Sequence, residues 1–238
     1  MLACDGLVME VTRRCNIRCD HCLRGEPQMI DMSRAVVDAT LRQVNSVYHL
    51  TLTGGEPTLN LPIIDYIVQA FQKHEVGLES FYMATNGVNP SMAVIKTLIN
   101  LYEICDDKEE CRLEWSNDQY HEIMDCSEPE MYQILSIYGK KYSEEVKKKY
   151  GEGNIINEGR ANWNGLSQHN HSLESIWLGE DEDGSGNLRL ESTLYISANG
   201  NIMTDCDCAF ERIDDECIGN ILTDNLEEVL RGHAEEIH

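Results

Sequence analysis

After Gly6, short β-branched apolar runs alternate with longer amphipathic segments, and this alternation constrains the fold more than any other feature of the sequence. Such a pattern is typical of parallel β-strands that are connected by helices. Ser33 is the expected N-cap of the first helix, and Pro90 is expected to open the third. The predicted strands cover 7–12, 47–55, 80–87, 111–118 and 154–161, and the predicted helices cover 33–46, 61–74, 90–101, 128–139 and 143–150.

The pattern changes near the C-terminus. The stretch 178–187 is acidic and rich in glycine, which predicts a loop or hinge. The segment 188–208 then alternates with period two on both sides of Asn199-Gly200, a strong hairpin turn signal. A last helix is expected over 226–236. We therefore expect an α/β domain over 1–178 and a C-terminal extension over 179–238, which holds the hairpin, several cysteines and the final helix.

The overall charge and the cysteine content limit the partners and the compartment. A formal net charge of -23 repels phosphate backbones and anionic lipid headgroups, so nucleic acid and membranes are not expected partners. The N-terminus does not resemble a signal peptide, and no apolar run is as long as a membrane span. Ten cysteines without a secretory signal indicate a soluble protein of the reducing cytoplasm, where thiols are available as ligands.

Three of these cysteines directly follow the first predicted strand. Cys15, Cys19 and Cys22 have the spacing C-x3-C-x2-C, so one loop can direct three thiolates at a metal centre. Three thiolates with an open position suit an iron-sulfur cluster that leaves one iron for an outside ligand. His21 offers an alternative, because it could complete a Cys3His zinc site in a binding module without catalysis.

A second motif, TGGEP, ends the second predicted strand. Gly54 and Gly55 would let the backbone approach a small ligand closely, and Glu56 offers a carboxylate to a ligand ammonium. Together with the cysteine loop, this motif resembles the signature of the radical SAM superfamily. The resemblance covers about 7–161 and implies an α/β fold, a partial (β/α)6 barrel that is open on one side, with the C-terminal hairpin closing part of its mouth.

The resemblance also implies a set of cofactors. Cys15, Cys19 and Cys22 would ligate a 4Fe-4S cluster whose remaining iron binds S-adenosylmethionine, and Glu56 would pair with the amino group of that cofactor. Reductive cleavage of S-adenosylmethionine would release methionine and a 5'-deoxyadenosyl radical, which abstracts hydrogen from the substrate. The electron would come from a donor such as flavodoxin or ferredoxin.

Polar residues at the ends of the later strands fit the same family less specifically. Thr85 and Asn86 in ATNG would line the nucleoside pocket, although an Asn-Gly turn explains them equally well. Ser116 and Asp118 in WSND stand where the family has ribose or carboxylate contacts. Arg160, in a GRA motif, would pair with the cofactor carboxylate or would be a surface arginine.

Within the superfamily, the sequence is most similar to the SPASM and twitch branch of peptide-modifying enzymes. His21, before the third cysteine of the motif, is common in that branch. The hairpin of such proteins helps to hold an auxiliary iron-sulfur cluster, and Cys206, Cys208 and Cys217 are the candidate ligands here. No cysteine lies between Cys126 and Cys206, so one auxiliary cluster is the most that we expect. The alternative is a set of free thiols, one of which donates a hydrogen atom.

An open barrel leaves room for a large substrate, so the favoured function is cross-linking or epimerisation of a ribosomally made peptide. An activase that places a glycyl radical on a partner protein, a small-molecule radical SAM enzyme and the zinc-stabilised module remain alternatives. Cys4, Cys105 and Cys111 match no motif and are expected in the core or at the surface. His169 and His171 are interpreted as residues of a polar loop.

Overall fold

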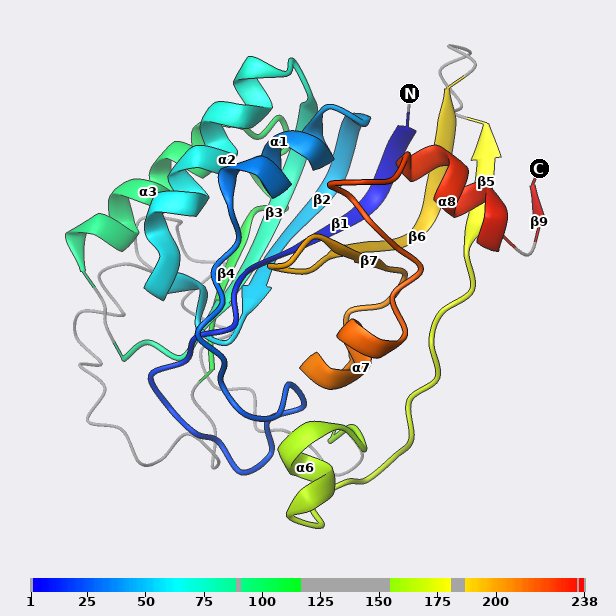
Figure 1. Cartoon of the computed structure of the whole chain (residues 1–238). Coiled ribbons are helices and arrows are strands. Elements are labelled where there is room, and N and C mark those ends of the chain that lie inside the picture. Colours follow the sequence, from blue (N-terminus) through cyan, green and yellow to red (C-terminus); the bar gives the residue numbers. More distant parts are fainter. Residues whose placement is uncertain (1, 89–90, 117–154, 181–186, 235, 238) are drawn as a thin grey trace.

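The computed structural model describes residues 2–88, 91–116, 155–180, 187–234 and 236–237 (Figure 1). The helices predicted over 128–139 and 143–150 lie outside the described residues, as do Pro90, Asp118 and Cys126.

The described strands form a single sheet with the order β4-β3-β2-β1-β6-β5-β9. Its parallel part confirms the predicted βα alternation, because β1 to β4 pair with one another in parallel and follow the chain order. The other edge of β1 pairs in parallel with β6, and β5 then joins β6 in antiparallel orientation. The strands in this order are β1 (Leu2–Thr12), β2 (Val44–Gly54), β3 (Gly77–Thr85), β4 (Arg112–Trp115), β5 (Trp177–Glu180), β6 (Leu188–Ile196) and β9 (Glu236–Ile237), and two further short strands join the sheet beside β6.

Three helices pack side by side on one face of the sheet, as Figure 1 shows. They are α1 (Arg34–Leu41), α2 (Leu61–Lys73), which follows the 3-10 turn η1 (Pro57–Asn60), and α3 (Met92–Ile104). Ser33 caps α1 as predicted, since its side chain accepts a hydrogen bond from Val36 N. The third helix begins later than predicted, because Ser91 caps it by accepting from Val94 N.

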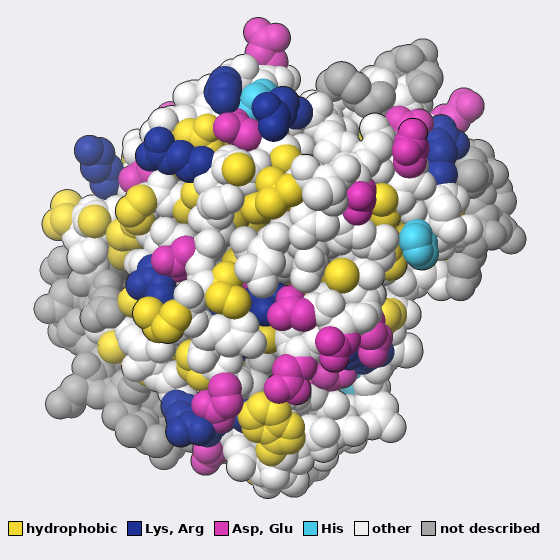
Figure 2. Space-filling view, viewed as in Figure 1, with side chains coloured by type: hydrophobic (Ala, Val, Ile, Leu, Met, Phe, Trp, Pro, Cys, Tyr) yellow, Lys and Arg dark blue, Asp and Glu magenta, His cyan; other side chains and the backbone are white. Residues whose placement is uncertain are grey.

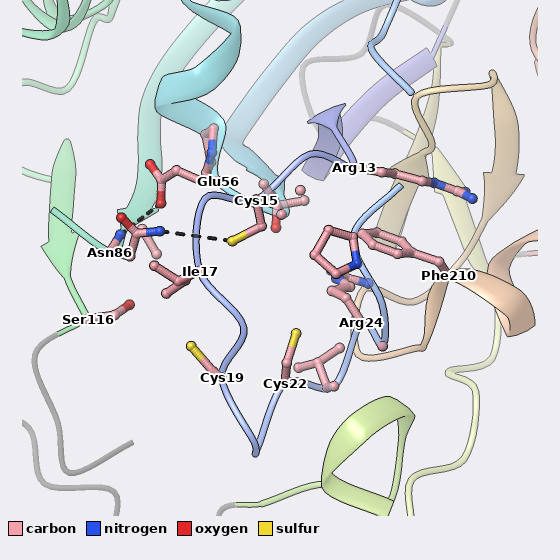
Figure 3. A pocket seen from close by; sticks show the side chains of 18 of the residues that line it. Arg13, Cys15, Ile17, Cys19, Cys22, Arg24, Glu56, Asn86, Ser116 and Phe210 are labelled. Atoms are coloured by element: carbon pink, nitrogen blue, oxygen red, sulfur yellow. Dashed lines mark hydrogen bonds between the residues drawn. The ribbon is translucent and has the colours of Figure 1, made fainter. Parts of the chain in front are cut away.

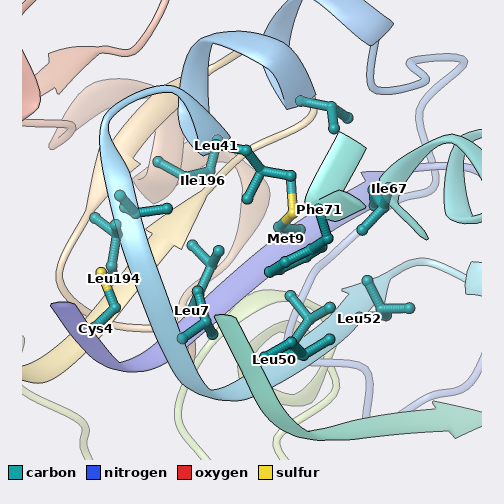
Figure 4. Close-up of a cluster of buried hydrophobic side chains, with 14 of the residues drawn as sticks. Cys4, Leu7, Met9, Leu41, Leu50, Leu52, Ile67, Phe71, Leu194 and Ile196 are labelled. Atoms are coloured by element: carbon teal, nitrogen blue, oxygen red, sulfur yellow. The ribbon is translucent and has the colours of Figure 1, made fainter. Parts of the chain in front are cut away.

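The main hydrophobic core lies between these helices and the sheet (Figure 4). Leu7 and Met9 of β1 are fully buried among apolar side chains of β2, β6 and α2, such as Leu50, Leu194 and Phe71. Strand β1 has a paired strand on both edges and a helix layer on one face, so most of its length reads as a continuous apolar run. Cys4, Cys105 and Cys111, expected from the sequence either in the core or at the surface, are all buried.

The predicted C-terminal hairpin is confirmed, but its first strand belongs to the main sheet. Strand β6 turns at Asn199-Gly200 into β7 (Asn201–Met203), which pairs with it in antiparallel orientation. Gly200 has a φ of 85°, the left-handed conformation that this turn requires. The remaining elements are α7 (Phe210–Asp215), β8 (Gly219–Asn220) and α8 (Leu226–His233).

The strand predicted over 154–161 is wrong. Residues Gly159–Trp163 form the short helix α6, and Ile156 makes only an isolated bridge with His169. The Arg160 N–H donates to the Cys22 carbonyl at 2.9 Å, so this segment packs against the loop after β1 and does not add a strand to the sheet. Gly159 also has a φ of 48°, which is incompatible with an extended strand.

The arrangement of parallel strands under a helix layer is that of a partial α/β barrel, the fold class expected from the sequence. None of the helices in the described part of the chain is both long and apolar enough to cross a lipid bilayer.

Candidate functional site

A pocket of about 390 Å³ opens where the parallel strands β1, β2, β3 and β4 reach their carboxyl ends. The end of a parallel sheet is where such folds build their sites. Most of the residues singled out in the sequence converge on this pocket. Those that line it are Cys15, Cys19, Cys22, Gly54, Gly55, Glu56, Thr85, Asn86, Ser116, Arg160 and Cys206.

The three-cysteine loop forms one wall of the pocket. The Cys15, Cys19 and Cys22 sulfur atoms all point into the same space in Figure 3, and none of these cysteines is paired in a disulfide. The Cys22 N–H donates to the Cys19 carbonyl at 3.3 Å, which closes a turn between the last two. The geometry and the donor set fit an iron-sulfur cluster with three protein ligands.

The pKa of the Cys15 thiol is raised to about 11, mainly by burial and to a smaller extent by the nearby Glu56 carboxylate and Cys22, against backbone hydrogen bonds from Ile17 and Asn16 that lower it. At neutral pH this thiol is therefore protonated, and a cation bound in the pocket would lower its pKa. Without a bound cation the wall does not present a reactive Cys15 thiolate.

Helix α6 holds the cysteine loop in place. The Arg160 N–H donates to the Cys22 carbonyl at 2.9 Å, and the Arg160 guanidinium forms ion pairs with Asp20 at 3.1 Å and Glu26 at 3.2 Å. A Cβ at Gly159 would lie 2.3 Å from the Leu23 carbonyl oxygen, so only glycine allows this contact. The GRA motif therefore stabilises the conformation of the cysteine loop, and its Arg160 also lines the pocket.

Glu56 connects the ends of β2 and β3. Its side chain is 1% exposed, and its Oε1 accepts from Thr58 N at 3.1 Å, Thr58 Oγ1 at 2.5 Å and Thr85 Oγ1 at 2.7 Å. Its Oε2 accepts from Asn86 N at 2.8 Å. The carboxylate therefore fixes the backbone of the third strand end while it lines the pocket.

The two glycines before Glu56 admit the neighbouring chain. A Cβ at Gly54 would lie 1.9 Å from the Thr12 carbonyl oxygen, and one at Gly55 would lie 2.3 Å from the Arg14 carbonyl oxygen. Two backbone hydrogen bonds hold this turn against the end of β1. Gly55 N donates to Thr12 O at 2.9 Å, and Glu56 N donates to Arg14 O at 2.8 Å. The tight contact expected with a ligand is in this structure a contact with the start of the cysteine loop.

The later strand ends also reach the pocket. The Asn86 amide donates to Asn16 Oδ1 at 2.9 Å and faces Cys15 Sγ at 4.0 Å, so it touches the cysteine loop (Figure 3). Ser116 N donates to the Thr85 carbonyl at 2.8 Å, which aligns the ends of β3 and β4. These residues form the wall beside Glu56.

The opposite wall was not foreseen from the sequence. Arg13, Arg24 and Phe210 line the pocket, together with Asp207. Arg13 is fully buried: its Nε donates to Glu10 at 2.6 Å and its terminal nitrogens to Asp214 at 2.6 and 2.8 Å. Burial by itself lowers the pKa of Arg13, but the bonds to Asp214 and Glu10 raise it above its usual value.

The sequence does carry a signal for this wall, which is a charged pair at the end of the first apolar strand. Glu10 stands in the middle of an apolar strand, where only a partner makes a buried charge tolerable, and Arg13 follows it by three residues. Its carboxylate also accepts from the Tyr195 hydroxyl and from Ala198 N at 3.0 Å. Those partners, like Asp214, lie almost the whole chain away and are not visible in local patterns.

The three C-terminal cysteines have different surroundings. Cys206 lines the pocket, whereas Cys208 and Cys217 do not. Cys208 is fully buried in a second small hydrophobic cluster with Val8 and Phe210, and Cys206 and Cys217 pack at its edge. Burial raises the pKa of both the Cys206 and Cys208 thiols to about 12.

Comparison with known proteins agrees with this geometry. The family model of the Radical SAM superfamily matches residues 9–141. The mitochondrial GTP 3',8-cyclase of Arabidopsis thaliana is 34% identical over 89 residues, which cover 34% of this chain and 22% of that protein. The PqqA peptide cyclase of Methylorubrum populi is 34% identical over 100 residues, which cover 39% of this chain and 24% of that protein.

The matched segment thus spans only about a quarter of the length of these curated relatives. Among solved structures, native anSMEcpe with bound AdoMet and Kp18Cys peptide has a TM-score of 0.57 at 14% identity, over 95% of this chain and 80% of that one. At this identity the likeness concerns the fold.

Proposed function

The chain is an enzyme of the radical SAM superfamily, and we propose that it uses a 4Fe-4S cluster and S-adenosylmethionine to modify a peptide. The observation that carries the proposal is the convergence of three thiols and the Glu56-centred strand ends on one pocket. When bound, the cluster and S-adenosylmethionine supply a 5'-deoxyadenosyl radical that abstracts hydrogen from the substrate.

In this proposal Cys15, Cys19 and Cys22 hold the cluster, and the strand ends hold S-adenosylmethionine. Glu56 is suited to the cofactor's ammonium group, because a carboxylate has about four acceptor sites and its Oε2 takes a single hydrogen bond among those described. Arg160 is suited to its carboxylate, since the buried Arg160 Nε has no hydrogen-bond partner among the residues that the structure describes.

The remaining contacts come from residues that line the same pocket beside Glu56. In the proposal, Thr85, Asn86 and Ser116 contact the adenosine and ribose of the cofactor. The backbone at Gly54 and Gly55 lies beneath its methionyl group. All of these belong to rigid strand ends that are tied to one another by hydrogen bonds. The chain therefore orients the cofactor with little reorganisation on binding.

A peptide with basic residues is the proposed substrate class. Helix α7, which contributes Phe210 to the pocket, carries exposed acidic side chains, and Figure 2 shows acidic groups gathered over α7. The members of this patch on α7 are Glu211, Asp214, Asp215 and Glu216, the last one just past its end. Asp214 pairs with Arg13 and Glu216 with Arg212, so Glu211 and Asp215 contribute most of its negative charge. A rim of this charge attracts cationic substrates and repels anionic ones. By name, the relative from Methylorubrum populi acts on a peptide.

The second candidate is a small-molecule substrate, which the similarity to a GTP 3',8-cyclase favours. A nucleoside triphosphate requires uncompensated cations. Of the four arginines that line the pocket, Arg13 and Arg18 form ion pairs with carboxylates of this chain, and Arg24 donates to the Cys208 carbonyl. Arg160, which pairs with Asp20, is assigned above to the cofactor carboxylate. This compensation favours the peptide over the triphosphate.

Deuterium transfer tests the substrate class directly. The enzyme, prepared without oxygen and loaded with iron and sulfide, is given S-adenosylmethionine, a reductant and either a perdeuterated peptide fraction or a perdeuterated nucleotide fraction from host cells. Deuterium in 5'-deoxyadenosine, measured by mass spectrometry, is expected with the peptide fraction alone. Transfer from the nucleotide fraction alone would replace the peptide proposal with the small-molecule one.

The auxiliary cluster on Cys206, Cys208 and Cys217 stays a prediction, and about eight rather than about four iron atoms per chain would support it. We also propose a cytoplasmic location and a flavodoxin or ferredoxin as electron donor, in keeping with nine described cysteines that are all free.

A further inference from the structure

Outside the pocket, His171, Asp205 and Cys208 bring one ligand atom each to within 4.8 Å of one another. The His171 Nε2 lies 2.6 Å from Asp205 Oδ2, with Cys208 Sγ beside this pair. We infer that these three side chains form a binding site for one divalent transition-metal ion, and Zn²⁺ is the ion that their chemistry suits best. This use of Cys208 is an alternative to the auxiliary cluster predicted on Cys206, Cys208 and Cys217, and an iron content near eight atoms per chain would contradict it.

The site is assembled from two loops that the fold holds together. His171 lies in the coil between α6 and β5, and Asp205 and Cys208 lie between β7 and α7. Thr204 Oγ1 donates to the Glu174 carbonyl at 3.0 Å, and Glu174 N donates to Asp205 Oδ2 at 3.2 Å. The two loops are therefore tied to each other next to the three ligands.

Asp205 is also oriented from its other side. Its Oδ1 accepts from Asp207 N at 2.8 Å, so both oxygens of the carboxylate have backbone partners. Hydrogen bonds of this kind, one layer beyond the ligands, fix the direction of metal-binding carboxylates. The carboxylate is thus pre-oriented toward His171 and Cys208.

Burial and charge favour a cation at this position. Asp205 is 3% exposed and Cys208 is fully buried, whereas the His171 side chain is 19% exposed and leaves a path for an ion. A divalent ion would take the place of the direct contact between His171 Nε2 and Asp205 Oδ2. The carboxylate and a Cys208 thiolate would then balance its two positive charges without an uncompensated buried charge.

The donor set identifies the class of metal. One sulfur, one imidazole nitrogen and one carboxylate oxygen match Zn²⁺, which binds tetrahedrally and takes water in a fourth position. Neighbouring ligand atoms in such a tetrahedron are about 3.3–3.6 Å apart, so the three side chains need only small shifts. A nucleophilic Cys-His pair is not supported, because Cys208 is inaccessible to a substrate.

X-ray absorption at the zinc edge tests the site in the iron-loaded, full-length enzyme, because iron does not contribute at that edge. After equilibration with Zn²⁺ and removal of excess, we expect about one zinc per chain, with one sulfur neighbour at about 2.3 Å and nitrogen or oxygen neighbours otherwise. Cys208→Ser should remove the sulfur neighbour, and His171→Gln should lower zinc retention at least about tenfold.

Two matched variants make the result specific. His169→Gln removes the other histidine of the same loop, and Cys217→Ser removes a thiol at the edge of the same hydrophobic cluster. Both should retain zinc and the one-sulfur signature. His171→Gln leaves the apolar cluster intact, so it guards against misfolding of the Cys208 variant.

Three results would overturn the inference: no zinc retained by the wild type, three sulfur neighbours, which place the ion on the loop 15–22, or loss of zinc in Cys217→Ser. Iron content measured on the same samples reports the three-cysteine loop separately. If the protein retained iron but bound no zinc, the zinc site would be refuted and the proposed function would be unaffected.

Discussion

Glu56 shows how a short turn motif organises a site. One buried carboxylate accepts hydrogen bonds from Thr58, Thr85 and the backbone of Asn86, so the ends of two parallel strands share a single anion. An acceptor-only group is needed there, because every neighbour named is a donor. The motif therefore carries a structural requirement as well as the proposed contact with a ligand ammonium.

Glu56→Gln should lower the free energy of unfolding by about 1–3 kcal/mol, since the amide NH₂ must face a donor whichever way it turns. Glu79→Gln, at an exposed position of β3, is the matched control and should change stability by less than about 0.5 kcal/mol. Urea denaturation measures both. Equal losses in the two variants would show that the hydrogen bonds to Glu56 contribute nothing specific.

At this scale the sequence predicted the residues whose partners are local or belong to a motif. Cys15, Glu56 and Asn86 all follow strands in short recognisable patterns, and the structure brings them to one pocket. Arg13 escaped prediction because its partner Asp214 is 201 residues away. No pattern within a short window contains that pairing.

At the scale of elements, the clearest dependence is that of the cysteine loop on α6. The helix has no sequence neighbour in the loop, yet its first residues pack directly against the Leu23 and Gly25 backbone. Arg160 then pairs with Asp20 and Glu26 on either side of the third cysteine. The loop conformation therefore depends on α6.

Gly159→Ala tests this dependence, because the added Cβ would lie 2.3 Å from the Leu23 carbonyl oxygen and 2.5 Å from Gly25 N. We expect iron content after anaerobic reconstitution to fall at least about threefold, with a stability loss above about 2 kcal/mol. Gly165→Ala is matched to it, since Gly165 has a φ of 67° with open space around the Cβ. That variant should lose only about 1 kcal/mol from backbone strain and keep its iron. Similar iron content in both variants would contradict the role of α6.

The mistaken strand at 154–161 has a physical reason at this scale. Ile155 and Ile156 give the segment a local strand preference. Gly159 has a φ of 48°, however, and the Arg160 N–H donates to the Cys22 carbonyl at 2.9 Å, so the chain turns into α6 against the cysteine loop. This contact joins residues that are more than 130 positions apart in the sequence, and a local pattern does not reveal it.

At the scale of the whole molecule, the N-terminal and C-terminal parts share one sheet and one buried charge network. Strand β6 extends the parallel sheet beside β1, and Arg13 at the end of β1 reaches Asp214 on α7. Arg13 also stacks on Phe210 at 4.8 Å. The C-terminal part therefore completes both the core and the wall of the pocket.

Arg13→Gln should destabilise the enzyme by about 3–5 kcal/mol, because it leaves the fully buried Glu10 carboxylate without its cation. Arg189→Gln offers the contrast: Arg189 pairs with Asp5 between β6 and β1, but both side chains are partly exposed at 23% and 32%. That loss should stay below about 1 kcal/mol. Unfolding of both variants in guanidinium chloride measures the difference in stability. If Arg13→Gln lost as little stability as Arg189→Gln, the buried network of Glu10, Arg13 and Asp214 would not be important for stability.

The most direct test of the whole account is the iron content and cofactor cleavage of protein prepared without oxygen. We predict about four or more iron atoms per chain and formation of 5'-deoxyadenosine from S-adenosylmethionine under strong reductant. Cys19→Ala, whose integrity is checked by circular dichroism, should retain the fold but form no 5'-deoxyadenosine above background. Wild-type protein without iron, or a Cys19→Ala variant that cleaves S-adenosylmethionine at the wild-type rate, would contradict the assignment of the three-cysteine loop.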